Sequence, residues 1–424
     1  MVKRNLLSLP AHDGTIAQLV EQRIENPCVP GSNPGSTTGK PALCWLFCFP
    51  LFRVISSSNS TALSQKPTYI SLASGPTEGL FQAGLKTSGS TLPDWYIVDD
   101  FFQKNQAIEW LSDAVEQGRV FWLSAGEASK SLVCVEKVLK WLVKSGAKRN
   151  ESIAVVGGGT VLDLGLFVAS IYQRGMQKWA IPTTLLATVD AGIGGKNGVN
   201  FIGLKNYIGT ITQPDVVLSD FRVLDTLSPL DVLNGWMEMA KHGLVADAEL
   251  WREMKTFEAV PRPASIHRLI ERAAGIKKRL VESDERENGL RKTLNFGHTV
   301  GHALESVASA QKLDLPHGIA VGLGMAFSLH WSANRTNDLA TQKKLIESAE
   351  CIHSWLKRDA SEQVKSTIEM AEAEALWSCM QKDKKNTAQG VQEVVLTKIG
   401  QAEWNQRLSF TAFTDSWSSA TASI

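Results

Sequence analysis

The chain has 424 residues, of which 43% are hydrophobic, and a formal net charge of +1. This length is sufficient for two domains, because single domains commonly contain about 100–200 residues. The near balance of 44 basic and 43 acidic residues excludes a global basic field that would favour nucleic acid or an anionic membrane, so we expect a small-molecule partner. Six cysteines without zinc-finger or disulfide-scaffold spacing are typical of a reducing compartment, and we expect a cytoplasmic protein.

The N-terminal segment does not have the pattern of a folded domain. Its first part carries clusters of Pro, Gly, Ser and Asn with no sustained period of 2 or 3.6. We therefore predict that residues 1–68 are a disordered or spurious extension. The apolar run from Ala42 to Phe52 contains Pro50 and is too short to span a bilayer, so we expect no membrane partner and no export.

Regular structure is predicted from Tyr69 onward. Apolar runs near Trp95, Arg119 and Ser152 indicate buried strands, and helical patterns separate them. This alternation predicts a nucleotide-binding α/β domain with a parallel sheet over residues 69–228. Successive helical patterns then predict an all-α, metal-binding domain over residues 229–404. The Ser- and Thr-rich residues 405–424 are expected to form a flexible tail.

A glycine-rich turn follows the third predicted strand. Gly157 to Gly159 allow backbone amides to approach a phosphate closely, and the following helix directs its positive end at the same point. This pattern favours a dinucleotide pyrophosphate, although a packing turn would have the same sequence. Asp163 lies one turn into the helix. Asp99 or Asp100, at the end of the first strand, can hold an adenosine ribose or can be a solvated strand end.

A polar segment between residues 181 and 206 carries further candidates. Thr183 and Thr184 follow a predicted strand and can donate their hydroxyls to a cofactor, while Asp190 can accept a hydrogen bond from a sugar hydroxyl.

The same segment predicts an anion site. Lys196 and Lys205 bracket a glycine-rich loop that ends at Asn206, which favours binding of a substrate phosphate. The alternative for each lysine is an ordinary solvated surface charge.

A metal site is predicted from one acid and two histidines. Glu238, His298 and His317 each lie on a segment with helical apolar spacing. One carboxylate and two neutral imidazoles suit zinc, with coordination positions left for substrate oxygens. His302 follows His298 by four residues on the same helical face, so spacing alone would also allow it as a ligand. Core or surface histidines remain the alternative for each imidazole.

These segments together resemble the 3-dehydroquinate synthase family, which are sugar-phosphate cyclases of the shikimate pathway. The resemblance runs from about residue 69 to 402, through motifs in one order that include GGGTVLDLGLFVAS, IPTTLLATVDAGIGGKNGVN, GWMEMAKHGL, RKTLNFGHTVGHALE and PHGIAVGLGM. It implies a homodimer with NAD bound to the N-terminal domain, zinc or cobalt bound to the helical domain, and an active site between the two.

The resemblance also implies roles for individual residues. The metal ligands would be Glu238, His298 and His317. Cofactor-binding residues would be Asp99, Glu127, Lys130, Gly158, Gly159, Thr160, Asp163, Thr183, Thr184, Lys196, Lys205 and Thr226. Substrate-binding and catalytic residues would be Asp190, Lys196, Lys205, Asn206, Lys241, Lys277, Arg291, Asn295, His302, Lys384 and, from the partner subunit of the dimer, Arg174. The choices between Asp99 and Asp100 and between Lys384 and Lys385 stay open.

The implied reaction converts 3-deoxy-D-arabino-heptulosonate 7-phosphate to 3-dehydroquinate and phosphate. NAD takes a hydride from a ring hydroxyl whose pKa the cation lowers, phosphate leaves by β-elimination, and the hydride then returns. Ring opening and intramolecular aldol closure complete the conversion. The resemblance assigns His302 to the substrate phosphate, and Arg291 with Lys277 to the substrate carboxylate.

Three positions depart from the family pattern without removing a proposed ligand. They are Ile319 and Asp231, where glutamate is usual, and Met237, where alanine is common. Other functions therefore stay open: a cyclase that forms 2-deoxy-scyllo-inosose or a valiolone, a metal-dependent alcohol or glycerol dehydrogenase, and a non-catalytic binding protein. Retention of Arg291 and Lys277 favours the dehydroquinate reaction, because the substrates of the other cyclases lack the carboxylate.

Overall fold

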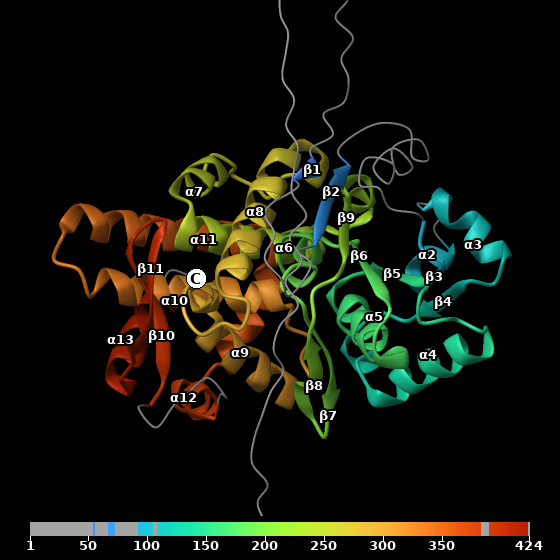
Figure 1. Ribbon diagram of the computed structural model, residues 1–424. Helices are drawn as coiled ribbons and strands as arrows, with labels where there is room; N and C mark the ends of the chain where they lie inside the picture. The colour runs from blue at the N-terminus through green and yellow to red at the C-terminus, as the bar shows by residue number, and fades with distance from the viewer. Residues whose placement is uncertain (1–53, 56–66, 73–91, 105–107, 383–389, 423–424) are drawn as a thin grey trace, which may run out of the picture. The chain divides into compact units, whose positions relative to one another are not determined.

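The computed structural model describes residues 54–55, 67–72, 92–104, 108–382 and 390–422 (Figure 1). Most of the predicted extension, including the apolar run from Ala42 to Phe52, lies outside these residues, and so does Lys384. Among the residues that are described, no helix combines the length and apolar character needed to cross a membrane.

The N-terminal half is built on a sheet whose strands are mostly parallel. Within the described residues the strand order is β1-β2-β9-β6-β5-β3-β4, and only the β1–β2 pair is antiparallel. The strands are β1 (Val54–Ile55), β2 (Thr68–Leu72), β3 (Trp95–Asp99), β4 (Val120–Leu123), β5 (Ser152–Gly157), β6 (Gln177–Pro182) and β9 (Val216–Asp220). The predicted parallel sheet is confirmed.

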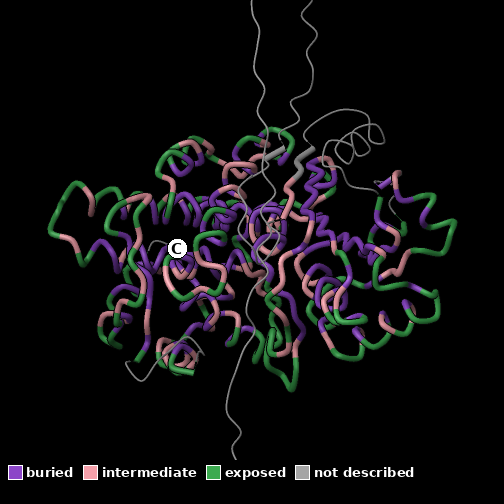
Figure 2. Tube along the Cα trace, viewed as in Figure 1, coloured by how far each residue is buried: buried purple, intermediate pink, exposed green. Residues whose placement is uncertain are grey.

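Apolar side chains on both faces explain why the central strands are buried (Figure 2). Along β3, Ile97 packs with the helices on one face of the sheet, whereas Val98 belongs to the cluster on the other face. The helices of this half, in which η marks a short 3-10 or π-helical turn, are α2 (Phe101–Lys104), η1 (Glu109–Leu111), α3 (Ser112–Glu116), η2 (Glu127–Ser129), α4 (Leu132–Lys144), α5 (Gly159–Ile171), η3 (Tyr172–Arg174), η4 (Ala187–Ala191) and η5 (Phe221–Thr226). A hairpin of β7 (Lys196–Phe201) and β8 (Leu204–Ile211) carries the predicted anion loop.

The C-terminal half is helical and surrounds one apolar cluster that includes Trp236, Trp251 and Trp355. Its first segments are α6 (Pro229–Ala246), α7 (Ala248–Met254), η6 (Pro263–Ser265), α8 (His267–Ser283) and η7 (Leu290–Asn295). They are followed by α9 (His298–Ala310), α10 (His317–Ala333), α11 (Leu339–Met370) and α12 (Ala373–Gln381). Residues 290–310 form the two segments η7 and α9 and not one continuous helix.

The end of the chain differs from the expected flexible tail. Residues Phe410–Thr421 form helix α13, and its Phe413 and Trp417 are buried in the C-terminal cluster. An antiparallel pair, β10 (Gln392–Lys398) and β11 (Gln401–Arg407), also adds a small sheet to the helical half (Figure 1). The prediction for residues 405–424 was wrong because the Ser and Thr content obscured apolar residues that recur at helical spacing.

Candidate active site

Three helices each supply one of the predicted metal ligands. Glu238 lies inside α6, whereas His298 and His317 are the first residues of α9 and α10. The positive end of a helix dipole acts against a charged imidazolium, although for His317 the neighbouring carboxylates outweigh this effect.

Close backbone approaches bring these helix ends together. The Gly318 amide donates to the side-chain oxygen of Asn234, one turn before Glu238 on α6, and a methyl group at Gly318 would overlap the Asn234 carbonyl. Gly297, directly before His298, has a φ of 76°, and a Cβ there would lie 2.6 Å from the side chain of Met325. These two positions therefore require glycine.

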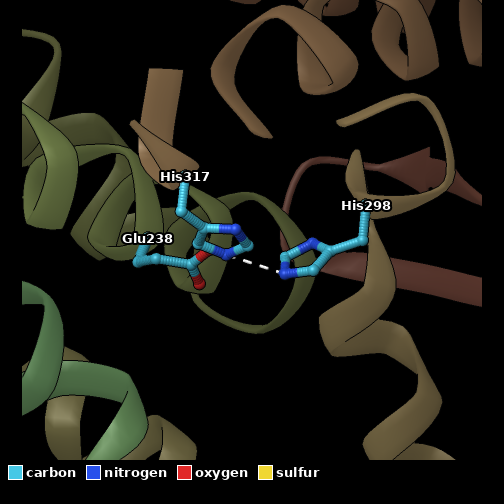
Figure 3. Close-up of side chains that lie close together, drawn as sticks. All are labelled: Glu238, His298 and His317. Carbon is cyan, nitrogen blue, oxygen red and sulfur yellow. Dashed lines mark ion pairs between the residues drawn. The ribbon is translucent and has the colours of Figure 1, made fainter. Parts of the chain in front are cut away.

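The three ligand side chains converge on one point (Figure 3). The Nε2 atoms of His298 and His317 lie 3.6 and 3.5 Å from Glu238 Oε1, and ligand atoms of all three residues lie within 4.8 Å of one another. Glu238 is fully buried and ion-paired with Lys241, yet neither carboxylate oxygen has a hydrogen-bond partner among the described residues. A carboxylate and two imidazoles in this arrangement fit a zinc or cobalt ion.

The electrostatics favour a charged carboxylate at this point. Burial opposes ionisation of Glu238, but the Lys241 ammonium outweighs it and lowers the pKa of Glu238 to about 2. Burial also opposes charging of His317, whereas the carboxylates of Glu238 and Glu305 raise its pKa to about 10. A cation bound between the ligands would replace that proton, because metal binding requires the neutral ring.

A second charged cluster adjoins the metal ligands. Asp190, on the π-helical turn η4, lies 2.6 Å from the Lys277 ammonium and 3.9 Å from that of Lys241. Burial opposes its ionisation, but Lys277 and then Lys241 hold the pKa of Asp190 well below its usual range. Burial lowers the pKa of Lys277 in spite of Asp190. Lys241 and Lys277 are thus buried around Asp190, beside the candidate metal ligands.

Residues of the predicted anion loop contact the helical half. Lys196 on β7 forms an ion pair with Glu287, whose other oxygen accepts a hydrogen bond of 2.6 Å from Asn295. Lys205 on β8 lies 3.3 Å from Glu305 on α9. The loop lysines are therefore held beside the segments that carry the metal ligands.

Arg291 is buried against the same glycine loop. Its guanidinium donates to the backbone carbonyls of Glu285, at 2.6 Å, and Gly194, at 3.3 Å. A Cβ at Gly194, where φ is 123°, would lie 2.5 Å from the guanidinium nitrogen. The bond to Gly194 holds the guanidinium against the glycine loop, and a guanidinium with its five donors has the chemistry to bind a carboxylate.

Several of the predicted cofactor residues lie at the point where the strand order of the sheet reverses. The chain runs from β3 to the edge strand β4 and then returns to β5 on the other side of β3. Asp99 and Gly157 end these neighbouring strands, and the amide of Thr183 donates to the Gly157 carbonyl at 3.0 Å. In sheets of this order, ligands bind beside the carboxyl ends of the strands at the switch point.

Side chains connect the glycine turn to the preceding loop. The Gly126 amide donates to Thr160 Oγ1 at 3.2 Å, next to Glu127. Buried Lys130 contacts Asp163 at 2.7 Å and also donates to Asn206. A Cβ at Gly158 would lie 3.1 Å from the side chain of Thr184, so Gly158 keeps this turn close to the end of β6. Amides at the start of α5 in such a turn fit the pyrophosphate of NAD.

Two predicted site residues are not joined to these groups. Among the described residues, neither Arg174 nor Thr226 forms a hydrogen bond or an ion pair with another predicted site residue. Arg174 is exposed at the end of η3 with a φ of 70°, and the Thr226 hydroxyl donates to the Val223 carbonyl. Asp99 Oδ1 accepts from the Phe101 amide, whereas Asp100 accepts from Ser124, so neither is excluded from a ribose contact.

The structure adds three residues that sequence reasoning missed. Glu287 and Glu305 face the loop lysines, and buried His242 lies one turn after Glu238, 3.9 Å from Asp190. Each stands within or beside a motif already singled out, and for His242 and Glu305 the available signal was a polar residue on the same helix as Glu238 or His298.

A cavity of about 960 Å³ lies between η4, η5 and α8. Its lining includes Thr188, Ile193, Phe221, His267 and Lys278, but none of the three candidate metal ligands. The candidate active site therefore rests on its converging side chains and not on the size of this cavity.

Comparison with known proteins identifies the family. The family profile described as 3-dehydroquinate synthase N-terminal matches residues 120–234, and the C-terminal profile matches residues 235–386. The chain belongs to the 3-dehydroquinate synthase family. It is 39% identical over 298 residues to the 3-dehydroquinate synthase of Streptococcus mutans, covering 70% of this chain and 81% of that protein. It is also 39% identical over 295 residues to the 3-dehydroquinate synthase of Streptococcus thermophilus, covering 68% and 78%.

Solved structures of two other cyclases share the fold. One is the 2-epi-5-epi-valiolone synthase of Streptomyces hygroscopicus with NAD+ and Zn2+ bound, at a TM-score of 0.69, 23% identity and coverage of 86% of this chain and 99% of that chain. Another is a 2-deoxy-scyllo-inosose synthase complexed with carbaglucose-6-phosphate, NAD+ and Co2+, at a TM-score of 0.68, 19% identity and coverage of 83% and 96%. At these identities the likeness of this chain to the two structures concerns the fold alone.

Proposed function

We propose that this protein converts 3-deoxy-D-arabino-heptulosonate 7-phosphate to 3-dehydroquinate and phosphate, with NAD and a zinc or cobalt ion as cofactors. The observation that carries the proposal is the convergence of Glu238, His298 and His317, in a chain of the 3-dehydroquinate synthase family. When bound, NAD supplies reversible hydride transfer and the cation lowers the pKa of a substrate hydroxyl.

The side chains of this chain bind and orient the substrate around that centre. Lys196, Lys205 and Asn206 would hold the phosphate, because they lie on one hairpin and meet the helical half through Glu287 and Glu305. Such orientation of a leaving group can lower the activation barrier by several kcal/mol. Positioning of reactants in general can lower a barrier by ~7–11 kcal/mol.

Buried cations would recognise the other end of the substrate. Lys277 and the guanidinium of Arg291 suit a carboxylate, and Asp190 keeps Lys277 and Lys241 in place beside the metal ligands. Asn295 and His302, from η7 and α9, would complete the pocket, since the rings of His302 and His298 are 5.3 Å apart.

The proposal extends to assembly and location. We propose a cytoplasmic homodimer in which Arg174 of one subunit reaches the substrate of the other, because Arg174 is exposed and turned by its positive φ at the end of η3. Lys384 would join the substrate pocket from outside the described residues.

A single assay tests the reaction. Purified protein with zinc and catalytic NAD should release phosphate from the heptulosonate phosphate and form dehydroquinate without net NADH. Cyclisation of glucose 6-phosphate would instead indicate an inosose synthase, and steady NADH formation from a simple alcohol would indicate a dehydrogenase.

A variant pair tests the metal site in the same assay. Glu238→Gln should abolish turnover while leaving NAD affinity unchanged, since it weakens the cation site and not the glycine turn. Glu347→Gln, the same chemical change at an exposed position of α11, is the matched control. Full activity of Glu238→Gln would contradict the metal assignment.

A further inference from the structure

Each ring of the two metal-binding histidines has one nitrogen facing Glu238 and one facing away from it. The Nε2 atoms lie 3.6 Å (His298) and 3.5 Å (His317) from Glu238 Oε1. The Nδ1 atom of His298 lies 3.2 Å from the backbone carbonyl of Phe296, and that of His317 lies 3.5 Å from Glu305 Oε2. The outer nitrogens therefore have different partners, a backbone carbonyl in one case and a carboxylate in the other.

These outer partners decide which nitrogen carries the proton. A carbonyl oxygen can only accept, so Nδ1 of His298 must donate and its Nε2 lone pair faces the metal point. An ionised carboxylate is likewise an acceptor, and Glu305 therefore favours the same tautomer of His317. A metal-binding imidazole commonly donates its other N–H to such a group, which orients the ring and makes it a better ligand.

Glu305 is itself held from a second side. Its Oε1 atom lies 3.3 Å from the ammonium of Lys205 on β8, while Oε2 faces His317 on α10. The carboxylate is only 14% exposed, and its two oxygens contact residues of two different segments, β8 and α10. Lys205 fixes the carboxylate that faces the His317 ring, and this links the loop proposed to bind phosphate with the proposed metal site.

We propose that Glu305 is a positioning residue that sets the tautomer and ring orientation of His317, so that Nε2 of His317 is directed at the cation. This role rests on the proposed metal site of Glu238, His298 and His317. It predicts that Glu305 acts on metal affinity through His317 without being a ligand.

A second group of possible metal ligands includes Glu305, and the experiment must distinguish this ligand role from the positioning role. Ligand atoms of His302, Glu305 and His317 also lie within 4.8 Å of one another, so Glu305 can be imagined as a direct ligand of a second cation. A positioning residue changes the affinity of one ion, whereas a ligand of a second ion changes the number of ions bound.

Metal titration of the purified full-length protein tests the proposal. We expect the wild type to bind one zinc ion, measured by competition with a chromophoric chelator, and Glu305→Ala to bind one ion about 10–100-fold more weakly. Glu305→Gln should retain most of the affinity, because its amide oxygen can still accept from Nδ1. Glu347→Ala and Glu347→Gln on α11 are the matched controls and should titrate like the wild type.

Cobalt absorption and metal-free folding complete the experiment. The visible spectrum of the cobalt-loaded Glu305→Ala protein should change in shape, because a misoriented His317 alters the ligand field. Urea denaturation of the metal-free proteins shows whether the alanine variant folds. If it does not, Glu305→Ser replaces it with the same expected loss of affinity, because the short hydroxyl does not reach Nδ1 of His317.

Distinct outcomes overturn the positioning role and the metal site. Wild-type zinc affinity in folded Glu305→Ala overturns the positioning role while leaving the proposed function intact. Two zinc ions in the wild type, one of which is lost in Glu305→Ala, overturn it in favour of a second cation site. If the wild type and Glu238→Gln both fail to bind zinc, the proposed function itself fails.

Discussion

Asp163 shows how burial and a specific partner compete at one residue. Its carboxylate is 2.7 Å from the buried Lys130 ammonium, one turn into helix α5 behind the glycine turn. Burial disfavours the ionised form more than Lys130 favours it, and the pKa of Asp163 is raised to about 6. The family resemblance implied a cofactor contact for this residue, whereas its pairing with Lys130 became visible only in the structure.

This raised pKa predicts a pH dependence of stability. Below about pH 4 Asp163 is protonated in the folded and unfolded states, so it contributes nothing. As pH rises toward 6 the unfolded chain ionises first, and the folded state loses up to about 3 kcal/mol from this group. Asp163→Asn should remove that loss. The free energies of unfolding of the variant and the wild type should be measured by urea denaturation between pH 4.5 and 7.5. Their difference should shift in favour of the variant as pH rises. A difference that does not change with pH would contradict the raised pKa of Asp163.

The sequence predicted the candidate metal ligands but not the acidic residues that pair with the neighbouring lysines. Glu238, His298 and His317 could be proposed because a carboxylate with two imidazoles is a recognisable donor set and because the family motifs contain them. Glu287, between α8 and η7, and Glu305, on α9, were missed, since an acidic residue is normally solvated and only the position of Lys196 or Lys205 reveals its partner.

At the scale of elements, the metal site depends on how closely α10 approaches α6. Gly318, the second residue of α10, allows its backbone to lie against Asn234, and this contact places His317 beside Glu238. The helices themselves were predicted from apolar spacing, but the approach between them was not.

A pair of glycine substitutions tests this contact. Gly318→Ala should lower the free energy of unfolding by about 1–3 kcal/mol, because the added methyl group overlaps the Asn234 carbonyl in a packed core, and zinc affinity should fall with it. Gly275→Ala is the control. Gly275 lies inside α8, where a Cβ would meet only the Arg279 guanidinium at 3.6 Å, so alanine should leave stability unchanged or raise it by up to about 1 kcal/mol. Urea denaturation and zinc titration of both variants provide the measurement, and equal behaviour of the two would refute the close-approach argument.

At the scale of the whole molecule, the metal site ties together distant parts of the chain. Its ligands come from α6, α9 and α10, and its neighbours Asp190 and Lys205 come from the N-terminal half. A cation that binds only when these segments are assembled must stabilise the folded state.

Zinc should therefore raise the unfolding free energy by mass action. Free zinc at about 100 times its dissociation constant should add about 2.7 kcal/mol to the wild type, provided that the unfolded chain does not bind it. Glu238→Gln should show little of this gain, whereas Glu347→Gln should behave like the wild type. Thermal or urea denaturation at several zinc concentrations measures the effect, and equal stabilisation of wild type and Glu238→Gln would place the bound ion elsewhere.

The sequence by itself determined the parallel α/β half and the helical half, and it predicted Glu238, His298 and His317 as metal ligands. Alternating strand and helix patterns are local properties, and the donor chemistry of a carboxylate with two imidazoles does not depend on where the helices lie. The family motifs extended this to the substrate and cofactor residues.

Only the tertiary structure decided which charges meet and how the chain ends. Lys130 with Asp163, Lys277 with Asp190, and Glu305 between His317 and Lys205 are contacts between segments far apart in the sequence, which periodicity cannot report. Helix α13 likewise forms because Phe413 and Trp417 are buried in the C-terminal cluster, although its composition is that of a loose tail. In each case the deciding free energy comes from burial and pairing across the fold, and not from local propensity.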